Sequence, residues 1–258
     1  MKIPVSEVYF GDCMEYMKTI PDKYFELAIA DPNYGIGASR PSEKPSTIKQ
    51  KNGTRLKVKN PIYTHKDWDD TSATKEYFDE CIRVSKNQII WGANYYNYNF
   101  GKGRLVWDKI NGNSDQMDCE IAYCSYNDRT DLIYFMWAGM MQGIYCGKEI
   151  RKAIIQQGNK ALNEERIHPT QKPVELYKYL IENYASKNDK ILDTHLGSQS
   201  SRIAAYDLGF YFYGCELDEE YFKSCCERFE RHKRKREEVK QFGYAKTELS
   251  KINPLLFE

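Results

Sequence analysis

The fold is decided by the stretch Ile191-Leu192-Asp193-Thr194-His195-Leu196-Gly197-Ser198. Its apolar start predicts a buried strand over 190–194, and the helical spacing after the turn predicts a helix over 200–208. The small residues between them let a ligand approach the backbone, and the amino terminus of the helix favours an anionic group. This strand, turn and helix therefore predict an α/β fold with a ligand site at the turn.

The next predicted strand, 211–216, ends on an acidic residue, Glu216. It follows the turn by about 20 residues, the spacing at which α/β folds place an acid that binds ribose hydroxyls. The alternative role for Glu216 is that of a carboxylate stabilised by the dipole of the following helix. The neighbouring turn favours the ribose role.

Strands and helices alternate along the rest of the chain. We predict strands over 7–10, 25–30, 88–91, 104–107, 120–125 and 132–137, and helices over 13–17, 74–86, 173–186 and 219 to about 240. The order predicts a mixed, mostly parallel sheet with helices on both faces. Because the chain shows no internal repeat and no clean linker, we expect a single domain over 1–258.

Composition excludes several classes of protein. Hydrophobic content of 41% with 29% charged residues is ordinary for a soluble protein, and no run approaches the roughly 18 to 20 apolar residues of a membrane span. The first ten residues lack the apolar stretch of a secretory signal, so we expect a cytoplasmic protein. The eight cysteines lack metal-binding spacing, which predicts reduced thiols and no metal site.

A basic segment over 38–66 stands out because the net charge of the chain is only +1. It carries eight Lys or Arg residues against one Glu, and its weak apolar periodicity predicts a loop or disorder. Two roles are equally compatible with it, a solvated surface loop and an arm that contacts phosphates. The candidate phosphate contacts are Arg40, Lys44, Lys49, Lys51, Arg55, Lys57 and Lys59.

The tetrapeptide Asp31-Pro32-Asn33-Tyr34 directly follows a predicted buried strand. It should therefore lie at the carboxyl edge of the sheet, where open α/β folds bind their ligands. A carboxylate and an adjacent backbone carbonyl can accept both hydrogens of an exocyclic amine, while an aromatic ring stacks on the base. The alternative is a simple turn.

These motifs, taken in order, resemble those of the beta-group DNA amino-methyltransferases of phage and bacterial restriction-modification type. The matching landmarks are Gly11-Asp12-Cys13, Asp31-Pro32-Asn33-Tyr34-Gly35-Ile36-Gly37, Trp91-Gly92-Ala93-Asn94-Tyr95, Trp107-Asp108-Lys109, His168-Pro169-Thr170-Gln171-Lys172-Pro173, the turn from Asp193 to Ser198, and Glu216-Leu217-Asp218. The resemblance implies a Rossmann-like fold with permuted motif order, in which the catalytic tetrapeptide precedes the cofactor turn. It also implies S-adenosylmethionine as cofactor.

The resemblance also implies the roles of individual residues. Asp31, Pro32, Asn33 and Tyr34 would form the catalytic site, and the cofactor would contact Asp12, Cys13, Thr170, Lys172, Asp193, His195, Gly197, Ser198 and Glu216. Lys172 would lie near the cofactor carboxylate, and its alternative is a surface lysine at a helix start. Asp31 at the first position of the tetrapeptide implies adenine, because the family usually has serine there when the target is cytosine.

The implied reaction is methylation of the N6 amine of an adenine that is flipped out of double-stranded DNA, without a metal. The range 126–166 is the candidate for reading bases, and the family's tendency to dimerise allows a homodimer. The chain departs from the family at Asn33, where a second proline is usual, and at Gln199, where a second loop glycine is usual. The alternatives are therefore N4 methylation of cytosine, transfer to RNA, and a catalytically silent homologue that binds DNA or cofactor.

Overall fold

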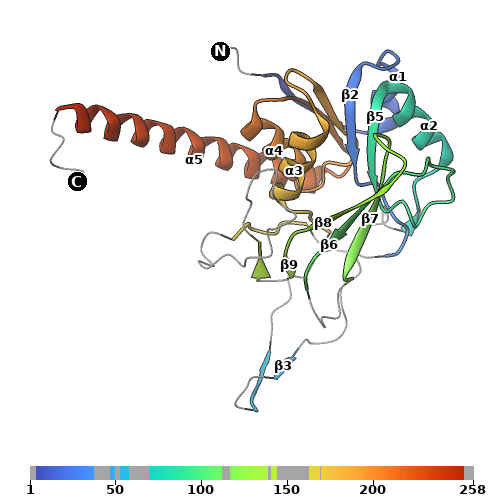
Figure 1. Cartoon of the computed structure of the whole chain (residues 1–258), viewed down its shortest axis with the longest axis horizontal. Coiled ribbons are helices and arrows are strands. Elements are labelled where there is room, and N and C mark those ends of the chain that lie inside the picture. Colours follow the sequence, from blue (N-terminus) through green and yellow to red (C-terminus); the bar gives the residue numbers. More distant parts are fainter. Residues whose placement is uncertain are drawn as a thin grey trace.

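An eight-stranded sheet forms the centre of the protein (Figure 1). The computed structural model describes residues 4–37, 47–49, 53–57, 70–111, 117–138, 141–143, 163–168 and 170–252. The strand order is β1 (Ser6–Phe10), β12 (Tyr211–Glu216), β11 (Lys190–Asp193), β2 (Phe25–Ala30), β5 (Ser85–Trp91), β7 (Cys119–Cys124), β6 (Arg104–Asp108) and β8 (Thr130–Tyr134).

The sheet is mixed and mostly parallel, as the order of elements predicts. β1, β12, β11, β2 and β5 pair in parallel, β7 is antiparallel to both of its neighbours, and β6 pairs in parallel with β8. All strands except β7 therefore end at the same edge. The strand that runs the other way brings its first residues, Cys119 and Glu120, to that edge instead.

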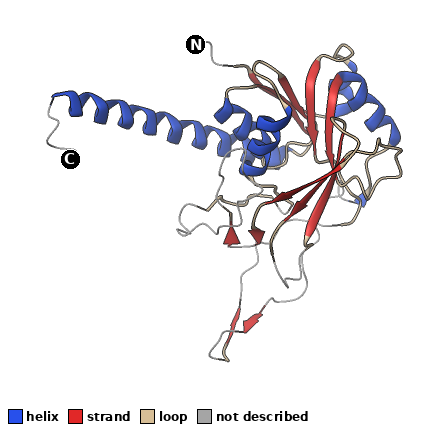
Figure 2. Cartoon of the chain, viewed as in Figure 1, coloured by secondary structure: helices blue, strands red, loops and turns tan. Residues whose placement is uncertain are grey.

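Helices cover both faces of the sheet because its central strands bury side chains on both sides (Figure 2). On β5, Ile89 and Trp91 face one hydrophobic core, and Ile90 faces the other. Helices α3 (Val174–Tyr184), α4 (Ser200–Leu208) and α5 (Glu219–Ile252) contribute to the first core, and α1 (Cys13–Lys18) and α2 (Lys75–Val84) contribute to the second.

Several boundaries differ from the predicted ones. α2 passes into β5 without a loop at Ser85, whose hydroxyl donates to the carbonyl of Cys81 at 2.5 Å, so the helix ends earlier and the strand starts earlier than predicted. The predicted strand over 132–137 divides into β8 and β9 (Trp137–Ala138), and β9 pairs with β10 (Met141–Gln142). β8 lies within the range proposed to read bases and forms an edge strand of the main sheet. Residues 144–162 lie outside the described residues.

α5 continues 12 residues beyond the predicted end at about 240, because polar residues without a proline can extend a helix. Figure 1 shows it projecting from the body of the molecule. None of the described helices is long and apolar enough to cross a membrane.

The basic segment is not a plain loop. β3 (Thr47–Lys49) and β4 (Arg55–Lys57) form an antiparallel ribbon that Figure 1 shows apart from the main sheet. The sequence carried a signal for it, because Asn52-Gly53 favours a tight hairpin and Gly53 has φ +83°. The backbones of Lys49, Arg55 and Lys57 lie in this ribbon, whereas the candidate contacts Arg40, Lys44, Lys51 and Lys59 lie outside the described residues.

Candidate active site

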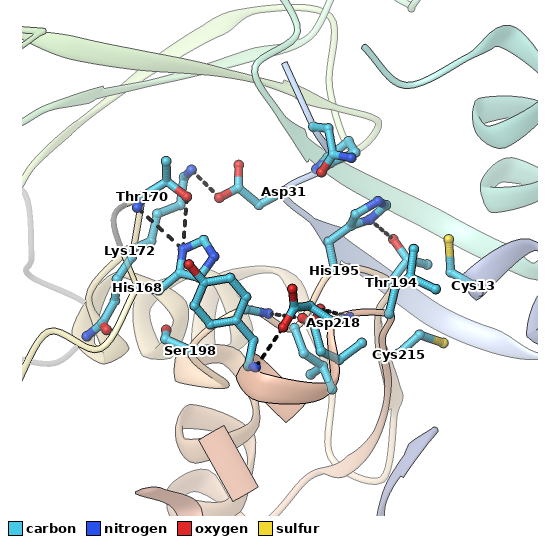
Figure 3. Close-up of a pocket in the computed structure, with 18 of the residues that line it drawn as sticks. Cys13, Asp31, His168, Thr170, Lys172, Thr194, His195, Ser198, Cys215 and Asp218 are labelled. Atoms are coloured by element: carbon cyan, nitrogen blue, oxygen red, sulfur yellow. Dashed lines mark hydrogen bonds and ion pairs between the residues drawn. The ribbon is translucent and has the colours of Figure 1, made fainter. Parts of the chain in front are cut away.

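Neighbouring strand ends build one cavity of about 210 Å³ (Figure 3). β2 and β11 are adjacent in the sheet, so the tetrapeptide after β2 lies beside the turn after β11. β12 and β1 follow on the other side of β11 and add their own ends. Except for Asp193, every predicted catalytic and cofactor residue lines this cavity: Asp12, Cys13, Asp31, Pro32, Asn33, Tyr34, Thr170, Lys172, His195, Gly197, Ser198 and Glu216.

Asp193 is buried and does not line the cavity, so its predicted direct contact with a cofactor has no support in this structure. One carboxylate oxygen accepts from the backbone N–H of His195 at 3.0 Å, and the other accepts from the Ser201 hydroxyl at 2.5 Å. Burial raises the pKa of Asp193 to about 7. Asp193 therefore holds the turn against the first residues of α4.

Glu216 lies where the turn meets the start of α5. Its carboxylate accepts from the backbone N–H of Gly197 at 2.8 Å and from that of Asp218 at 2.9 Å. Burial raises the pKa of Glu216 to about 6. Nearby, the Asp12 side chain accepts from the backbone N–H of Met14 at 2.8 Å and caps α1. Two carboxylates thus border the end of the cavity that is far from the tetrapeptide.

Two histidines also line the cavity, and both are neutral at pH 7 because burial lowers the pKa of His168 and of His195 to about 4. His195 Nδ1 lies 3.0 Å from the Thr194 hydroxyl, which in turn lies 2.6 Å from the Tyr77 hydroxyl. Across the described part of the chain, no cluster of three or more His, Cys, Asp or Glu side chains could hold a metal ion.

Gln199 stands at the family's glycine position, yet it does not enter the cavity. The residue is fully buried and has φ +59°. Its amide nitrogen donates to the Cys225 sulfur at 2.8 Å, and its amide oxygen accepts from Arg202 at 3.0 Å. The side chain of Gln199 therefore packs between α4 and α5 and does not obstruct a ligand in the cavity.

We expect Gln199→Gly to leave the affinity for S-adenosylhomocysteine, an analogue of the cofactor that the resemblance implies, unchanged within about twofold, which corresponds to about 0.4 kcal/mol. Glycine adopts the left-handed backbone without strain, and the lost side chain made no contact with the cavity. Isothermal titration calorimetry measures this. A tenfold gain in affinity on introducing glycine would show instead that Gln199 obstructs the site.

Asp31 lies at the opposite end of the cavity with both of its oxygens engaged. Oδ1 accepts from the Tyr34 hydroxyl at 2.5 Å, and Oδ2 lies 2.6 Å from Lys172 Nζ. Lys172 is therefore neither a surface lysine nor free for a cofactor carboxylate, because its buried ammonium group binds Asp31. Burial raises the pKa of Asp31, and Lys172 opposes that rise.

The rest of the tetrapeptide is fixed by aromatic packing. The Tyr34 ring stacks on Tyr95 with centroids 4.9 Å apart, and a Cβ at Gly92 would come within 2.2 Å of the Tyr34 ring. Only glycine fits there, and Gly92 also has φ +72°. The Tyr96 hydroxyl donates to the Pro32 carbonyl at 2.7 Å, which occupies one of the two lone pairs of that oxygen.

Sequence reasoning missed Glu120, which reaches the catalytic end from β7. Glu120 Oε2 lies 2.8 Å from Lys172 Nζ, and Oε1 lies 2.6 Å from Lys109 Nζ. Burial alone would raise the pKa of Glu120, but these two ammonium groups lower it below its ordinary value. No sequence signal marks Glu120, because its place depends on the reversed direction of β7.

A second missed network holds the segment that carries Lys172. Arg228 on α5 donates to Glu164 Oε1 and to the carbonyl of Ser198, both at 2.5 Å. The other Glu164 oxygen accepts from the backbone N–H of Val174, the first residue of α3, at 2.9 Å. This buried ion pair joins the cofactor turn, the start of α3 and α5.

The chain is similar to known proteins over most of its length. The profile of a family described as DNA methylase matches residues 25–227. The type II methyltransferase M.BglII of Bacillus subtilis is 22% identical over 261 residues, which cover 84% of this chain and 67% of that protein. The type II methyltransferase M2.LlaDCHI of Lactococcus lactis subsp. cremoris is 24% identical over 245 residues, which cover 83% of this chain and 85% of that protein.

A solved structure shows the same fold. The crystal structure of the M1.HpyAVI-SAM complex superposes with a TM-score of 0.50 at 17% identity, covering 87% of this chain and 100% of that chain. The predicted Rossmann-like methyltransferase fold, in which the tetrapeptide after β2 precedes the turn after β11, is thereby confirmed.

Proposed function

Because this chain belongs to the DNA methylase family, we propose that it methylates the N6 amine of an adenine flipped out of double-stranded DNA. The observation that carries the proposal is the single cavity that joins Asp31 at one end to Glu216 at the other. One end offers acceptors for an exocyclic amine, and the other offers carboxylates for sugar hydroxyls.

The methyl donor is S-adenosylmethionine, and the donor set of the cavity fits it. Glu216 would accept hydrogen bonds from the ribose hydroxyls, and Asp12 with the Cys13 backbone would contact the adenine part. His195, Gly197 and Ser198 would surround the methionine part, beside the neutral His168. When bound, S-adenosylmethionine supplies a methyl group on a positively charged sulfur, which leaves with the bonding electrons.

The residues of the tetrapeptide would prepare the amine for attack. An aromatic amine is a weak nucleophile because its lone pair is delocalised into the ring. Asp31 and the Pro32 carbonyl would accept its two hydrogens, so that the lone pair points at the methyl group, while Tyr34 stacks on the base. The lone pair would then form the nitrogen–carbon bond as the sulfur–methyl bond breaks, and the nitrogen would pass one proton to the Asp31 carboxylate. Asn33 keeps this acceptor set without the rigidity of a second proline.

The base is identified by digesting methylated DNA to nucleosides and measuring their masses. We expect N6-methyldeoxyadenosine after incubation with S-adenosylmethionine and bacterial genomic DNA that was amplified in vitro and so carries no methylated bases. N4-methyldeoxycytidine would assign the chain to the cytosine branch. Methylation of RNA alone, or cofactor binding without transfer to either nucleic acid, would refute the proposal.

The DNA duplex would be held outside the cavity. The basic ribbon would neutralise backbone phosphates, and the range 126–166 is the proposed base-reading region. A homodimer would enlarge this small recognition surface. We propose that the chain acts in the cytoplasm, where DNA is accessible.

Cofactor binding is expected to weaken as the pH falls through about 6, the pKa of Glu216. Above this pH the carboxylate is charged and accepts from hydroxyl groups, and protonation removes that charge. Calorimetry with S-adenosylhomocysteine between about pH 5 and about pH 8 measures the change. Glu216→Gln should bind on the order of tenfold to a hundredfold more weakly at the upper end and lose the step near pH 6.

Asp193 titrates nearby, because burial raises its pKa to about 7, so the contribution of Glu216 is the difference between wild type and Glu216→Gln. A matched control is Glu219→Gln, which removes an exposed carboxylate that pairs with Lys223 at the start of α5. It should reproduce the wild-type curve. Retention of the step near pH 6 in Glu216→Gln would contradict the ribose role.

A further inference from the structure

Lys172 joins two carboxylates at the catalytic end of the cavity. Its side chain is 2% exposed, and its Nζ lies 2.6 Å from Asp31 and 2.8 Å from Glu120. Lys109 binds the remaining oxygen of Glu120 at 2.6 Å. Two carboxylates and two ammonium groups therefore alternate from Asp31 to Lys109, and the charges of the row cancel.

The contact between Lys172 and Asp31 opposes the proposed reaction. The amine nitrogen gains positive charge as it attacks, and the Asp31 carboxylate has to stabilise that charge. An ammonium group bound to the same carboxylate competes with the amine for its lone pairs and repels the developing charge. Lys172 must therefore weaken its contact with Asp31 while the methyl group is transferred.

Glu120 is placed to receive the ammonium group. Because Lys172 Nζ already contacts both carboxylates, a small shift toward Glu120 frees Asp31 Oδ2 without leaving a buried cation unpaired. The pairing of β7 with β6 places Glu120 opposite Trp107. Lys109 follows β6 directly, and its contact with Glu120 holds the carboxylate in place. Lys109 in turn keeps Glu120 charged.

We propose that Glu120 is a positioning residue that holds Lys172 away from Asp31 when the target amine binds. This inference rests on the proposed function, because it concerns the carboxylate that would accept the amine. Glu120 would act through Lys172 and would not touch the base. Its effect should therefore appear in the rate of methyl transfer and not in cofactor affinity.

The test is single-turnover transfer of a radiolabelled methyl group from S-adenosylmethionine to in vitro amplified bacterial DNA, with enzyme in excess. Glu120→Gln keeps the size of the side chain and removes its charge, so Lys172 stays on Asp31. We expect the rate to fall on the order of tenfold to a hundredfold. The affinity for S-adenosylhomocysteine should stay within about twofold of wild type.

A double-mutant cycle separates this role from a purely structural one. Lys172→Met removes the ammonium group that Glu120 is proposed to hold, so adding Glu120→Gln to it should cause no further loss of rate. Glu120→Asp keeps the charge and should lose less rate than Glu120→Gln, which gives a second comparison if the glutamine variant folds poorly. Glu26→Gln is the matched control. Glu26 lies on β2, and the substitution likewise removes a pair between a glutamate and a lysine, in this case Lys86.

Two results would overturn the inference: a wild-type rate in Glu120→Gln, or an equal loss from Glu120→Gln with and without Lys172. Failure of the proposed function looks different, because the wild-type chain would then transfer no methyl group to DNA. An active wild type with an unaffected Glu120→Gln variant refutes the positioning role alone.

Discussion

Asp31→Asn should lower the rate of methyl transfer to DNA by at least about a thousandfold while the protein stays folded. The asparagine keeps the shape of the side chain but loses the charge that would stabilise the attacking amine. Folding is spared because Lys172, the buried partner of Asp31, keeps Glu120 as its counterion. Single-turnover transfer of a radiolabelled methyl group measures the rate, and circular dichroism with urea unfolding measures the fold.

The control for this variant is Asp22→Asn. Asp22 is an exposed carboxylate that pairs with Arg83 at 2.7 Å and does not line the cavity. We expect its rate to match wild type. For Asp31→Asn we expect normal affinity for the cofactor and almost no methyl transfer. Undiminished turnover in this variant would refute the catalytic role of the tetrapeptide.

Arg228→Met should lower the free energy of unfolding by about 3 to 5 kcal/mol. The substitution leaves the Glu164 carboxylate without its buried counterion, and the carbonyl of Ser198 loses a donor. Because Glu164 also binds the first backbone N–H of α3, the segment that carries Lys172 should loosen with it. Urea unfolding followed by tryptophan fluorescence measures the loss.

Two comparisons test the cause of this loss. Arg231→Met removes a more exposed arginine on the same helix, whose contact with Glu165 is 3.6 Å, and should change stability by less than about 1 kcal/mol. Adding Glu164→Gln to Arg228→Met should recover part of the loss, because the stranded charge is then removed. Equal losses in Arg228→Met and Arg231→Met would show that the buried pair contributes little.

The two strand-end motifs could be predicted because each is local in sequence. A buried strand followed by Asp31 or by the turn around Gly197 places those residues at the carboxyl edge of a parallel sheet, whatever the rest of the chain does. The ribbon of β3 and β4 was within reach as well, since Asn52-Gly53 favours a hairpin. It was missed because the surrounding residues are polar and show little apolar periodicity.

The orientations of individual side chains could not be predicted in this way. Asp193 and Gln199 stand at the two ends of the cofactor turn, yet both side chains bond to the helices and not to the cavity, Asp193 to Ser201 on α4 and Gln199 to Cys225 on α5. Their partners Ser201 and Cys225 become neighbours only when the helices pack. A family pattern assigns a role to such residues from their position in the sequence, and it holds no information on the direction of their side chains.

The sequence by itself determined the α/β fold and the edge of the sheet that holds the site, because strand periodicity and turn chemistry act over a few neighbouring residues. The family resemblance supplied most of the individual residues that were assigned to the site. Only the tertiary structure decided which charges meet there. Lys172 contacts both Asp31 and Glu120. Glu120 reaches the catalytic end because β7 runs antiparallel to its neighbours, so that the start of this strand lies at the edge where the other strands end. Pairing between strands far apart in the chain sets that direction, and no local pattern records it.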